Sequence, residues 1–404
     1  MKLLLSSIGS RGDVQPILAL ALQLRALGHS PTLLVAPNFK AWVESWGIEC
    51  VPIGLDVKQG ARRIQQQKPT KAQRSALARQ TVMSQFRTTT EAARGFDLIL
   101  AGGALQMAGR SVAEALGIPY VYAAYCPATL GSPDHPPPKL RPRIRSQTLP
   151  RWANRVLWAA DEQRWNRLFR ETLNAQRASL NLAPIDNVAR YVSTERPWLA
   201  ADPILGPAGS RREFEITQTG AWLLEDSSAL PDHLERFLAD GSPPIYFGFG
   251  SMQGSPASVG VLIQAARAIG RRALISEGWA GLTLPDAPAD CMVVGDVNHS
   301  KLFPRVAAVV HHGGAGTTTA AALAGIPQLI IPHIYDQYYW AHRIKVLGIG
   351  VSGHRTDLLS IETLVTLLRS CTAAELVEQA RSLMQRVTRQ GAHTAAVRLL
   401  DQLR

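Results

Sequence analysis

Two adjacent histidines stand directly before a glycine-rich turn in the segment VVHHGGAGTT, residues 309–318. The apolar run 307–310 predicts a buried strand, and the alanine-rich residues 317–324 predict a helix that ends at Gly325. The first turn of a helix offers unpartnered backbone N–H groups and the positive end of the helix dipole. This arrangement is typical of an anion site, with phosphate as the expected ligand and an imidazole as a further hydrogen-bond donor.

A carboxylate with the placement of a general base occurs near the other end of the chain. Asp13 follows an apolar strand, 2–8, and the turn GSRG at 9–12, and it stands at the start of an amphipathic helix. An ionised aspartate at the end of a strand can take a proton from a bound hydroxyl group. Capping of the helix is the alternative role for the same residue.

Several other chemistries are disfavoured by the spacing of the residues. A dinucleotide site needs G-x-G-x-x-G and an acidic residue about 20 positions later, but the second strand ends in Ala36-Pro37 without a carboxylate. The phosphate-loop pattern G-x-x-x-x-G-K-[ST], the pattern H-E-x-x-H and a D-x-D pair do not occur, so no metal site is expected. The four scattered cysteines are expected to be free thiols: Cys50, Cys126, Cys291 and Cys371.

Length and pattern together predict two α/β domains. A chain of 404 residues exceeds what one hydrophobic core usually supports. Short apolar strands alternate with helices in both halves, which favours two doubly wound parallel sheets. We expect an N-terminal domain at 1–215, a second domain at 216–390 and a last helix within 391–404 that packs back on the first domain. Because ligands bind beyond the carboxyl ends of such strands, the glycine turns are expected to face one interdomain cleft.

The positive charge is concentrated in two segments of the first half. The formal net charge is +12, and residues 58–94 hold nine Lys or Arg against one Glu, while residues 131–155 hold six against one Asp. The absence of a recognition-helix pattern or an interleaved aromatic platform disfavours nucleic acid as the partner. Contact with an anionic membrane and plain solvated loops are the two alternatives. Without an apolar run long enough to span a bilayer, we expect a cytoplasmic protein, peripheral at the membrane if those segments bind it.

Three motifs resemble one enzyme family in order and position. GSRGDVQP, VNHSKLFPRVAAVVHHGGAGTT and IPHIYDQYYWAHRIKVLGIG are similar to nucleotide-sugar glycosyltransferases of the GT-B fold, in particular those that glycosylate glycopeptide antibiotics and sterols. The resemblance covers most of the chain and is weakest at residues 59–180, the part that shapes the acceptor pocket in such enzymes. It implies a fold of two Rossmann-like domains with the active site between them.

The resemblance also implies roles for individual residues. Asp13 matches the general base and stands alone, because the segment LILAG at 98–102 lacks the acid that orients the histidine base of plant relatives. Asp336 and Gln337 match the pair that binds sugar hydroxyls, although Asp336 would also serve as an ordinary helix N-cap. His312 matches the histidine that contacts the donor phosphates, and His311 would then point into the fold. The other implied donor-binding residues are Ser10, Arg11, Ser251, Val297, His299, Ala315, Gly316 and Thr317.

The expected activity is transfer of a sugar, with inversion, to a hydroxyl of a lipid-like, sterol-like or natural-product aglycone. The pair Asp336-Gln337 resembles that of glucose users and favours UDP-glucose, which acts as a co-substrate rather than a cofactor. A dTDP-deoxysugar donor is the first alternative. A nucleotide-sugar epimerase of the same fold and a catalytically silent binding protein are further alternatives, although a silent relative should have lost the base or the donor motif.

Overall fold

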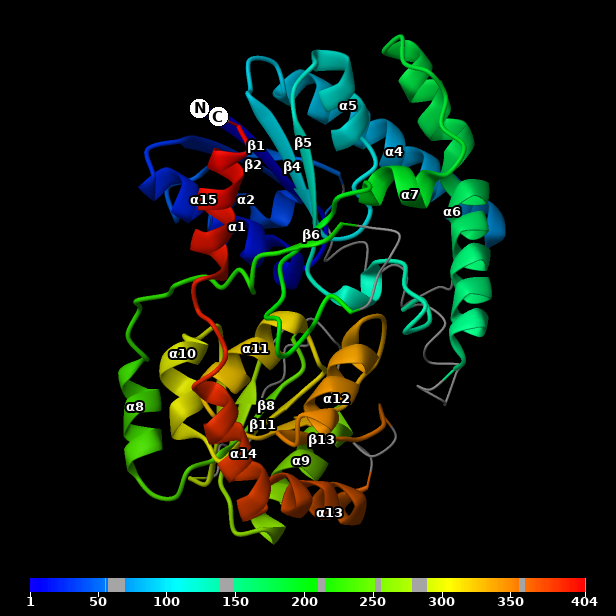
Figure 1. Ribbon diagram of the computed structural model, residues 1–404. Coiled ribbons are helices and arrows are strands. Elements are labelled where there is room, and N and C mark those ends of the chain that lie inside the picture. The colour runs from blue at the N-terminus through cyan, green and yellow to red at the C-terminus, as the bar shows by residue number, and fades with distance from the viewer. Residues whose placement is uncertain are drawn as a thin grey trace.

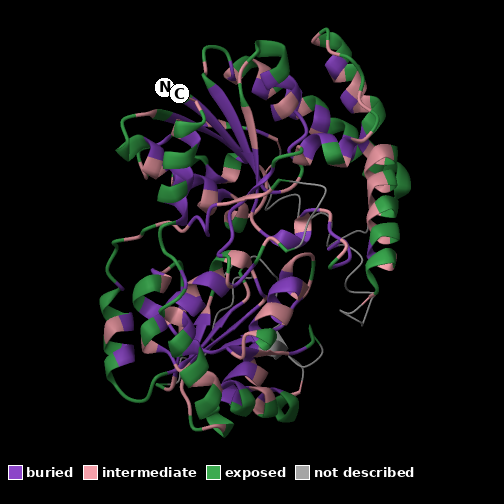
Figure 2. Ribbon diagram, in the orientation of Figure 1, coloured by how far each residue is buried: buried purple, intermediate pink, exposed green. Residues whose placement is uncertain are grey.

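The structure is a computed structural model that describes residues 1–54, 56, 70–138, 149–209, 215–250, 256–277, 289–355 and 360–403. These residues form two parallel sheets, each flanked by helices, one above the other in Figure 1. The predicted α/β class with two doubly wound sheets is therefore confirmed. Figure 2 shows that both sheets are buried, while the outward faces of the helices are exposed.

The first sheet has the strand order β3-β2-β1-β4-β5-β6-β7, and all of its pairings are parallel. The order reverses between β1 and β4, and ligands bind at this position in open α/β sheets. The strands are β1 (Lys2–Ser7), β2 (Ser30–Val35), β3 (Glu49–Pro52), β4 (Leu98–Gly102), β5 (Tyr120–Ala124), β6 (Trp198–Leu199) and β7 (Thr217–Gln218). The helices are α1 (Arg11–Ala26), α2 (Lys40–Glu44), α4 (Lys71–Ala92), α5 (Gly109–Leu116), α6 (Arg151–Ser179) and α7 (Val188–Ser193).

The second sheet repeats this plan with the order β10-β9-β8-β11-β12-β13, again with parallel pairings and a reversal between β8 and β11. Its strands are β8 (Ile245–Gly248), β9 (Ala273–Ser276), β10 (Cys291–Val294), β11 (Ala308–His311), β12 (Gln328–Ile330) and β13 (Gly350–Ser352). The helices are α8 (Asp232–Ala239), α9 (Pro256–Ala268), α10 (His299–Leu302), α11 (Ala315–Leu323), α12 (Gln337–Val346), α13 (Ile361–Cys371), α14 (Ala374–Met384) and α15 (Gly391–Asp401).

Two details of the sequence-based expectation are wrong. The pattern that begins near residue 216 does not open the second sheet, because Thr217 pairs with Trp198 as the edge of the first sheet. The basic segments are not simply loops, since much of the first is the helix α4 and the second runs into the helix α6. Residues 58–69 and 139–148 of those segments lie outside the described residues. The exact division between the domains stays a prediction.

The two domains share an apolar contact and a set of polar ones. Leu205 and Tyr122 of the first domain belong to one buried cluster with Trp340 and Ile344 of α12. The guanidinium group of Arg343 donates hydrogen bonds to the backbone carbonyls of residues 204 and 205, at 2.9 and 2.8 Å. The last helix, α15, returns to the first domain, where its alanines pack in the same cluster as α1. Both chain ends therefore lie close together on the first domain (Figure 1).

Candidate active site

Asp13 lies in the first turn of α1, at the end of the central strand β1. Its Oδ2 accepts hydrogen bonds from the backbone N–H of Ser10 at 2.8 Å and from the Ser10 hydroxyl at 3.0 Å. A side chain at Gly9 would overlap with this carboxylate, and a Cβ at Gly103 would lie 3.2 Å from Oδ1. The two glycines therefore leave room for a carboxylate that supports the start of the helix at the end of β1.

Burial changes the acidity of Asp13. Desolvation raises its pKa above the usual value of 3.8, against the opposing hydrogen bonds from Ser10. Tyr122 and Tyr125 at the end of β5 are close enough for the Asp13 charge to act on them, and burial raises the pKa of both phenols. Asp13 is thus a carboxylate of raised basicity among neutral phenols, which suits proton abstraction.

Arg11 connects the two domains. Its guanidinium group forms an ion pair with Asp296, which precedes Val297 in the second domain, and lies 4.8 Å from the centre of the Trp42 ring. The same positive charge contributes to the lowered pKa of His299. Arg11 and the predicted nucleoside-binding residues Val297 and His299 are therefore brought together across the domain boundary.

The two adjacent histidines differ in burial: His311 lies in the core, and His312 is only partly covered. His311 is fully buried; its Nδ1 accepts from the Gly313 N–H at 3.2 Å, so its Nε2 is assigned as the donor to Gln328 Oε1 at 3.0 Å. His312 is half-buried, and its ring lies against Gly250 and Gly314. The Gly248 carbonyl lies near that ring, but Nδ1 makes no hydrogen bond of ordinary geometry with the described residues. The expectation that His311 points into the fold is confirmed.

The imidazole of His312 is neutral at physiological pH in this structure. Its pKa is lowered to about 4, chiefly by burial and in smaller part by the nearby charge of His333. The helix α11 begins three residues later, after Gly314 in an extended conformation. Within the described part of the chain, no hydrogen bond from the N–H groups of Ala315, Gly316 or Thr317 is found. These groups and His312 are available to an anion.

Asp336 and Gln337 sit at the start of α12 but differ in their contacts. Asp336 Oδ2 accepts from the Trp340 indole N–H at 3.1 Å, and the side chain does not cap the helix backbone. Gln337 is buried, and its Oε1 accepts from the N–H groups of His333 and Ile334 at 2.7 and 3.0 Å. The oxygen of Gln337 is therefore already used to hold its own loop, which the sequence did not predict.

His299 opens the short helix α10 behind the second sheet. Its ring stacks on Phe303, with centroids 4.4 Å apart, and its Nε2 lies 3.3 Å from the Tyr246 hydroxyl. Burial is the main cause that lowers its pKa to about 4. A stacked, neutral ring at this position offers a flat surface beside Val297. Ser251, the remaining predicted donor residue, lies outside the described residues.

Two residues of this region were not singled out from the sequence. His333 follows β12, and its charge acts on His312, so it lies beside the expected phosphate position. Tyr335 has a positive φ of 59°, and the charges of both Asp336 and Asp13 act on its phenol. The phenol is therefore near both the predicted sugar-binding residue Asp336 and the predicted base Asp13. The motif alone gave no signal for either residue, because their roles depend on the conformation of the loop.

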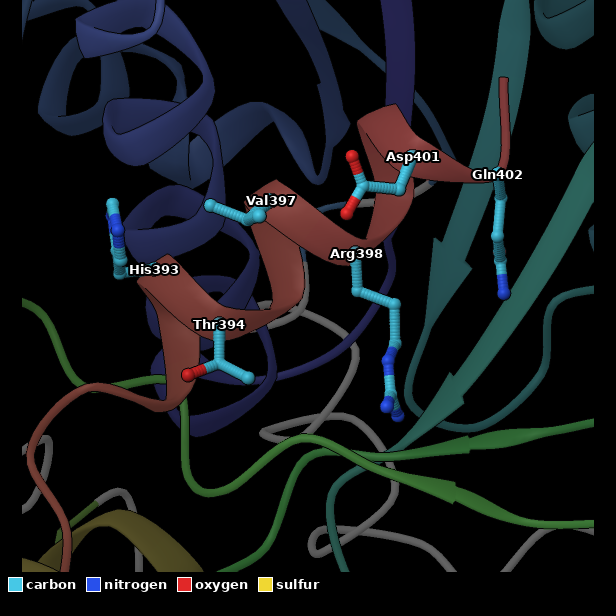
Figure 3. A pocket seen from close by; sticks show the side chains of 6 residues that line it. All are labelled: His393, Thr394, Val397, Arg398, Asp401 and Gln402. Atoms are coloured by element: carbon cyan, nitrogen blue, oxygen red, sulfur yellow. The ribbon is translucent and has the colours of Figure 1, made fainter. Parts of the chain in front are cut away.

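A surface hollow of about 550 Å³ lies apart from these residues. It follows the exposed side of α15, where His393 lies 3.3 Å from Gln23 in the C-terminal half of α1 (Figure 3). Asp13 is in the first turn of α1, and none of the predicted site residues lines this hollow. The lining residues are His393, Thr394, Val397, Arg398, Asp401 and Gln402.

Comparisons with known proteins agree with the fold of two α/β domains. Residues 3–132 match the glycosyltransferase family 28 N-terminal domain, and residues 276–397 match the C-terminal domain of erythromycin biosynthesis protein CIII-like proteins. A solved structure of the kitacinnamycin glycotransferase covers 100% of this chain and 98% of its own, with a TM-score of 0.75 and 17% identity. Two such sheets with these domains define a glycosyltransferase of the GT-B fold.

Several relatives from Amycolatopsis orientalis are about 40% identical to this chain. Glycosyltransferase GtfC is 41% identical over 99% of this chain and 97% of its own, and vancomycin aglycone glucosyltransferase is 40% identical over the same shares. A dTDP-epi-vancosaminyltransferase is 41% identical over 87% of this chain and 85% of its own. The chain belongs to the glycopeptide-antibiotic group of GT-B glycosyltransferases.

Proposed function

We propose that this protein is an inverting glycosyltransferase that moves glucose from UDP to a hydroxyl of a natural-product aglycone. The observation that carries the proposal is that each sheet has a candidate site at the point where its strand order reverses. One is the buried carboxylate of Asp13 after β1, and the other is the anion site of His312 and α11 after β11. The helices α1 and α11 are in contact, which supports an active site formed between the two motifs.

The proposed reaction is one displacement at the anomeric carbon. The acceptor oxygen bonds to that carbon while the bond from the carbon to the diphosphate oxygen breaks, and UDP leaves with the electron pair. Asp13 takes the proton of the acceptor hydroxyl, and attack from the side opposite the leaving group inverts the centre. The raised pKa of Asp13 brings its basicity closer to the working pH.

The leaving diphosphate is met by hydrogen-bond donors in this proposal rather than by a metal ion. His312 and the first-turn N–H groups of Ala315, Gly316 and Thr317 supply them, together with Ser10, Ser251 and Arg11 after its exchange of partner from Asp296. Val297 and His299 would hold the nucleoside, and Asp336 with Gln337 the sugar. No cluster of three or more potential metal ligands occurs among the described residues. On this proposal, activity should persist in the presence of EDTA.

A dTDP-sugar is the second candidate donor. One relative with 41% identity bears the name dTDP-epi-vancosaminyltransferase, whereas another with 40% identity is a glucosyltransferase. The name vancomycin aglycone glucosyltransferase also favours a glycopeptide or related aglycone as the acceptor over a sterol. The enzyme is therefore expected to accept an apolar or amphipathic molecule with a free hydroxyl.

The test is a transfer assay with two donors and a panel of acceptors. The purified chain is incubated with UDP-glucose or dTDP-glucose and with vancomycin-type aglycones, other natural-product aglycones and sterols. Product is detected by mass spectrometry and nucleotide release by chromatography, with and without EDTA. Transfer with UDP-glucose that survives EDTA supports the proposal. Transfer only from dTDP-glucose would replace the donor, and sugar-nucleotide binding without transfer to any acceptor would favour a silent binding protein.

We further infer a contact with an anionic membrane surface through α4 and α6. These helices pack against each other, and their exposed cations include Arg74, Arg79 and Arg155. The Trp152 side chain, at the start of α6, is 67% exposed. Among the described residues no helix could cross a bilayer, so the proposed contact is peripheral. Cytoplasmic location is part of the same proposal.

A further inference from the structure

The loop between β12 and α12 is held rigidly by its own side chains. Gln337 Oε1 accepts two backbone N–H groups, from His333 and Ile334. His333 Nδ1 lies 2.8 Å from the carbonyl of Ile331, and the Tyr338 hydroxyl donates to the carbonyl of His333 at 3.2 Å. The conformation of this loop is therefore determined on both sides of Tyr335.

Tyr335 carries backbone strain within that rigid loop. Its φ of 59° lies in the left-handed region, which a side chain with a Cβ disfavours and which glycine adopts freely. Strain of this kind persists only where the surrounding structure imposes it, and it is concentrated at functional sites.

The groups around the phenol come from both domains. The carboxylates of Asp336 in its own loop, Asp161 in α6 and Asp13 in α1 all act on it, and Arg164 in α6 opposes them. Asp161 is itself paired with Arg164 at 2.6 Å. Burial and these carboxylates raise the pKa of Tyr335 to about 12, so the hydroxyl keeps its proton at neutral pH. Within the described residues, that hydroxyl makes no hydrogen bond.

A donor group beside an acceptor group matches the chemistry of a sugar. Each sugar hydroxyl can both donate and accept a hydrogen bond, whereas an ionised carboxylate only accepts. On the proposed function, the sugar must lie between Asp13, which faces the acceptor, and Asp336. Tyr335 adjoins Asp336 in the chain, and its phenol is near enough to Asp13 for that charge to act on it, so it can supply the donor that the two carboxylates lack.

We propose that Tyr335 is a specificity-determining residue whose hydroxyl donates a hydrogen bond to a hydroxyl of the transferred sugar. This inference rests on the proposed transferase function, but it is separable from it. The hydrogen bond concerns binding of the sugar, so it can be measured without any acceptor.

The first experiment compares sugar nucleotides with the bare nucleotides by calorimetry. UDP-glucose and UDP, and dTDP-glucose and dTDP, are titrated into the wild type, Tyr335→Phe and Tyr120→Phe. The last variant is a matched control, because it removes a buried phenol hydroxyl that has no hydrogen-bond partner among the described residues and lies at the start of β5, outside the loop. Tyr335→Phe should weaken the sugar nucleotide roughly three- to tenfold, as expected for one lost hydrogen bond, and leave the bare nucleotide unchanged. Tyr120→Phe should preserve the wild-type ratio of the two affinities.

The binding measurements and the transfer assay can fail separately, which distinguishes this inference from the proposed function. If the ratio is unchanged in Tyr335→Phe, the role of Tyr335 is wrong while the transferase proposal stands. If the wild type binds sugar nucleotides but transfers to no acceptor, the transferase proposal fails and the ratio still decides the role of Tyr335. If the wild type binds the sugar nucleotides no tighter than the bare nucleotides, the sugar contact is overturned directly.

A second variant separates sugar recognition from packing. Tyr335→Gly removes the phenol and relieves the strained φ, so the melting temperature should stay level or rise while the sugar nucleotide is weakened as in Tyr335→Phe. A fall in melting temperature together with equal weakening of the bare nucleotide would assign Tyr335 to the stability of the fold instead. With monodeoxy-glucose donors, the wild type should disfavour one analogue, and Tyr335→Phe should lose that preference.

Discussion

At the residue scale, Asp13 combines two roles that the sequence presented as alternatives. Its carboxylate accepts two hydrogen bonds from Ser10 and so supports the start of α1. Its burial also raises its pKa, as a base near a bound acceptor requires. Because the helix-supporting role uses only an acceptor oxygen, an amide could fill it, whereas proton abstraction needs the carboxylate.

Asp13→Asn should therefore separate stability from turnover. The amide oxygen can accept both Ser10 hydrogen bonds, so the melting temperature should hardly change, while turnover should fall by roughly 10²–10⁴. Asp232→Asn is a matched control, because Asp232 is an exposed residue in the first turn of α8. Near wild-type turnover in Asp13→Asn would exclude this residue as the base.

The pH dependence follows from the direction of the Asp13 shift. A raised pKa means that the protonated form is favoured in the folded state, so this group stabilises folding at acid pH and ceases to do so as pH rises through the raised value. Asp13→Asn should accordingly cost no stability at neutral pH. The acid limb of kcat/KM should lie above pH 3.8, since catalysis needs the ionised form. An acid limb at or below that value would contradict the burial of the base.

Truncation of the two histidines should affect different properties, UDP affinity for His312 and stability for His311. His312→Ala removes a donor to a charged phosphate, worth about 1.5–3 kcal/mol, so UDP affinity should fall roughly tenfold to a hundredfold with little loss of stability. His311→Ala removes the buried hydrogen bonds to Gln328 Oε1 and from the Gly313 N–H, and it should chiefly lower the free energy of unfolding. Calorimetry and thermal unfolding of both variants check this, and the reverse order would mean that the phosphate contact belongs to His311.

At the element scale, the turns position the site more than the helices and strands do. The elements around both motifs, β1 with α1 and β11 with α11, could be predicted, because apolar periodicity and glycine turns are local signals. The pairing of β7 with β6 could not be predicted, since it joins Trp198 and Thr217, which are not neighbours in any local pattern of the sequence. The use of Gln337 to hold its loop and the positive φ of Tyr335 depend on loop geometry that no local pattern encodes.

The turn before α11 offers a test of this positioning. Gly314 has an extended backbone conformation that alanine adopts freely, but a Cβ there would lie 2.8 Å from His312 Nε2. Gly314→Ala should therefore displace the imidazole and weaken UDP binding about as much as His312→Ala, and the double variant should add little. Gly260→Ala in α9 is the control, since its Cβ would meet no atom within 4 Å. Full additivity of the two substitutions would show that Gly314 acts independently of the histidine.

At the scale of the whole molecule, the ion pair and the apolar cluster between the domains contribute differently to the stability of the domain contact. The cluster around Trp340 and the Arg343 hydrogen bonds fix the domains at one side of their contact. The pair of Arg11 and Asp296 links them on the nucleotide side, but the Asp296 side chain is 84% exposed, so the pair contributes little stability. Arg11 can therefore exchange this partner for the donor phosphates at small cost.

The charge distribution of the whole molecule leads to the last prediction. Apart from Arg94, the described cations of the basic segments lie on α4 and α6, which pack together on the first domain (Figure 1). Each well-placed cation contributes roughly 1 kcal/mol on an anionic bilayer, so three or four should hold the protein at the surface, and rising salt should release it. Exposed Trp152 and Val156 beside Arg151 and Arg155 would add apolar contact at the interface.

Flotation with liposomes tests this orientation directly. The protein should float with phosphatidylserine vesicles at low salt, much less at high salt, and not with neutral vesicles. The double variant Arg74→Glu and Arg79→Glu on α4 should release it, while Arg369→Glu, an exposed cation on α13 of the second domain, should not. Equal recovery on neutral and anionic vesicles, or none on either, would leave the basic segments as solvated surface and favour a soluble aglycone. Loss of flotation in Arg369→Glu alone would place the membrane contact on the second domain instead.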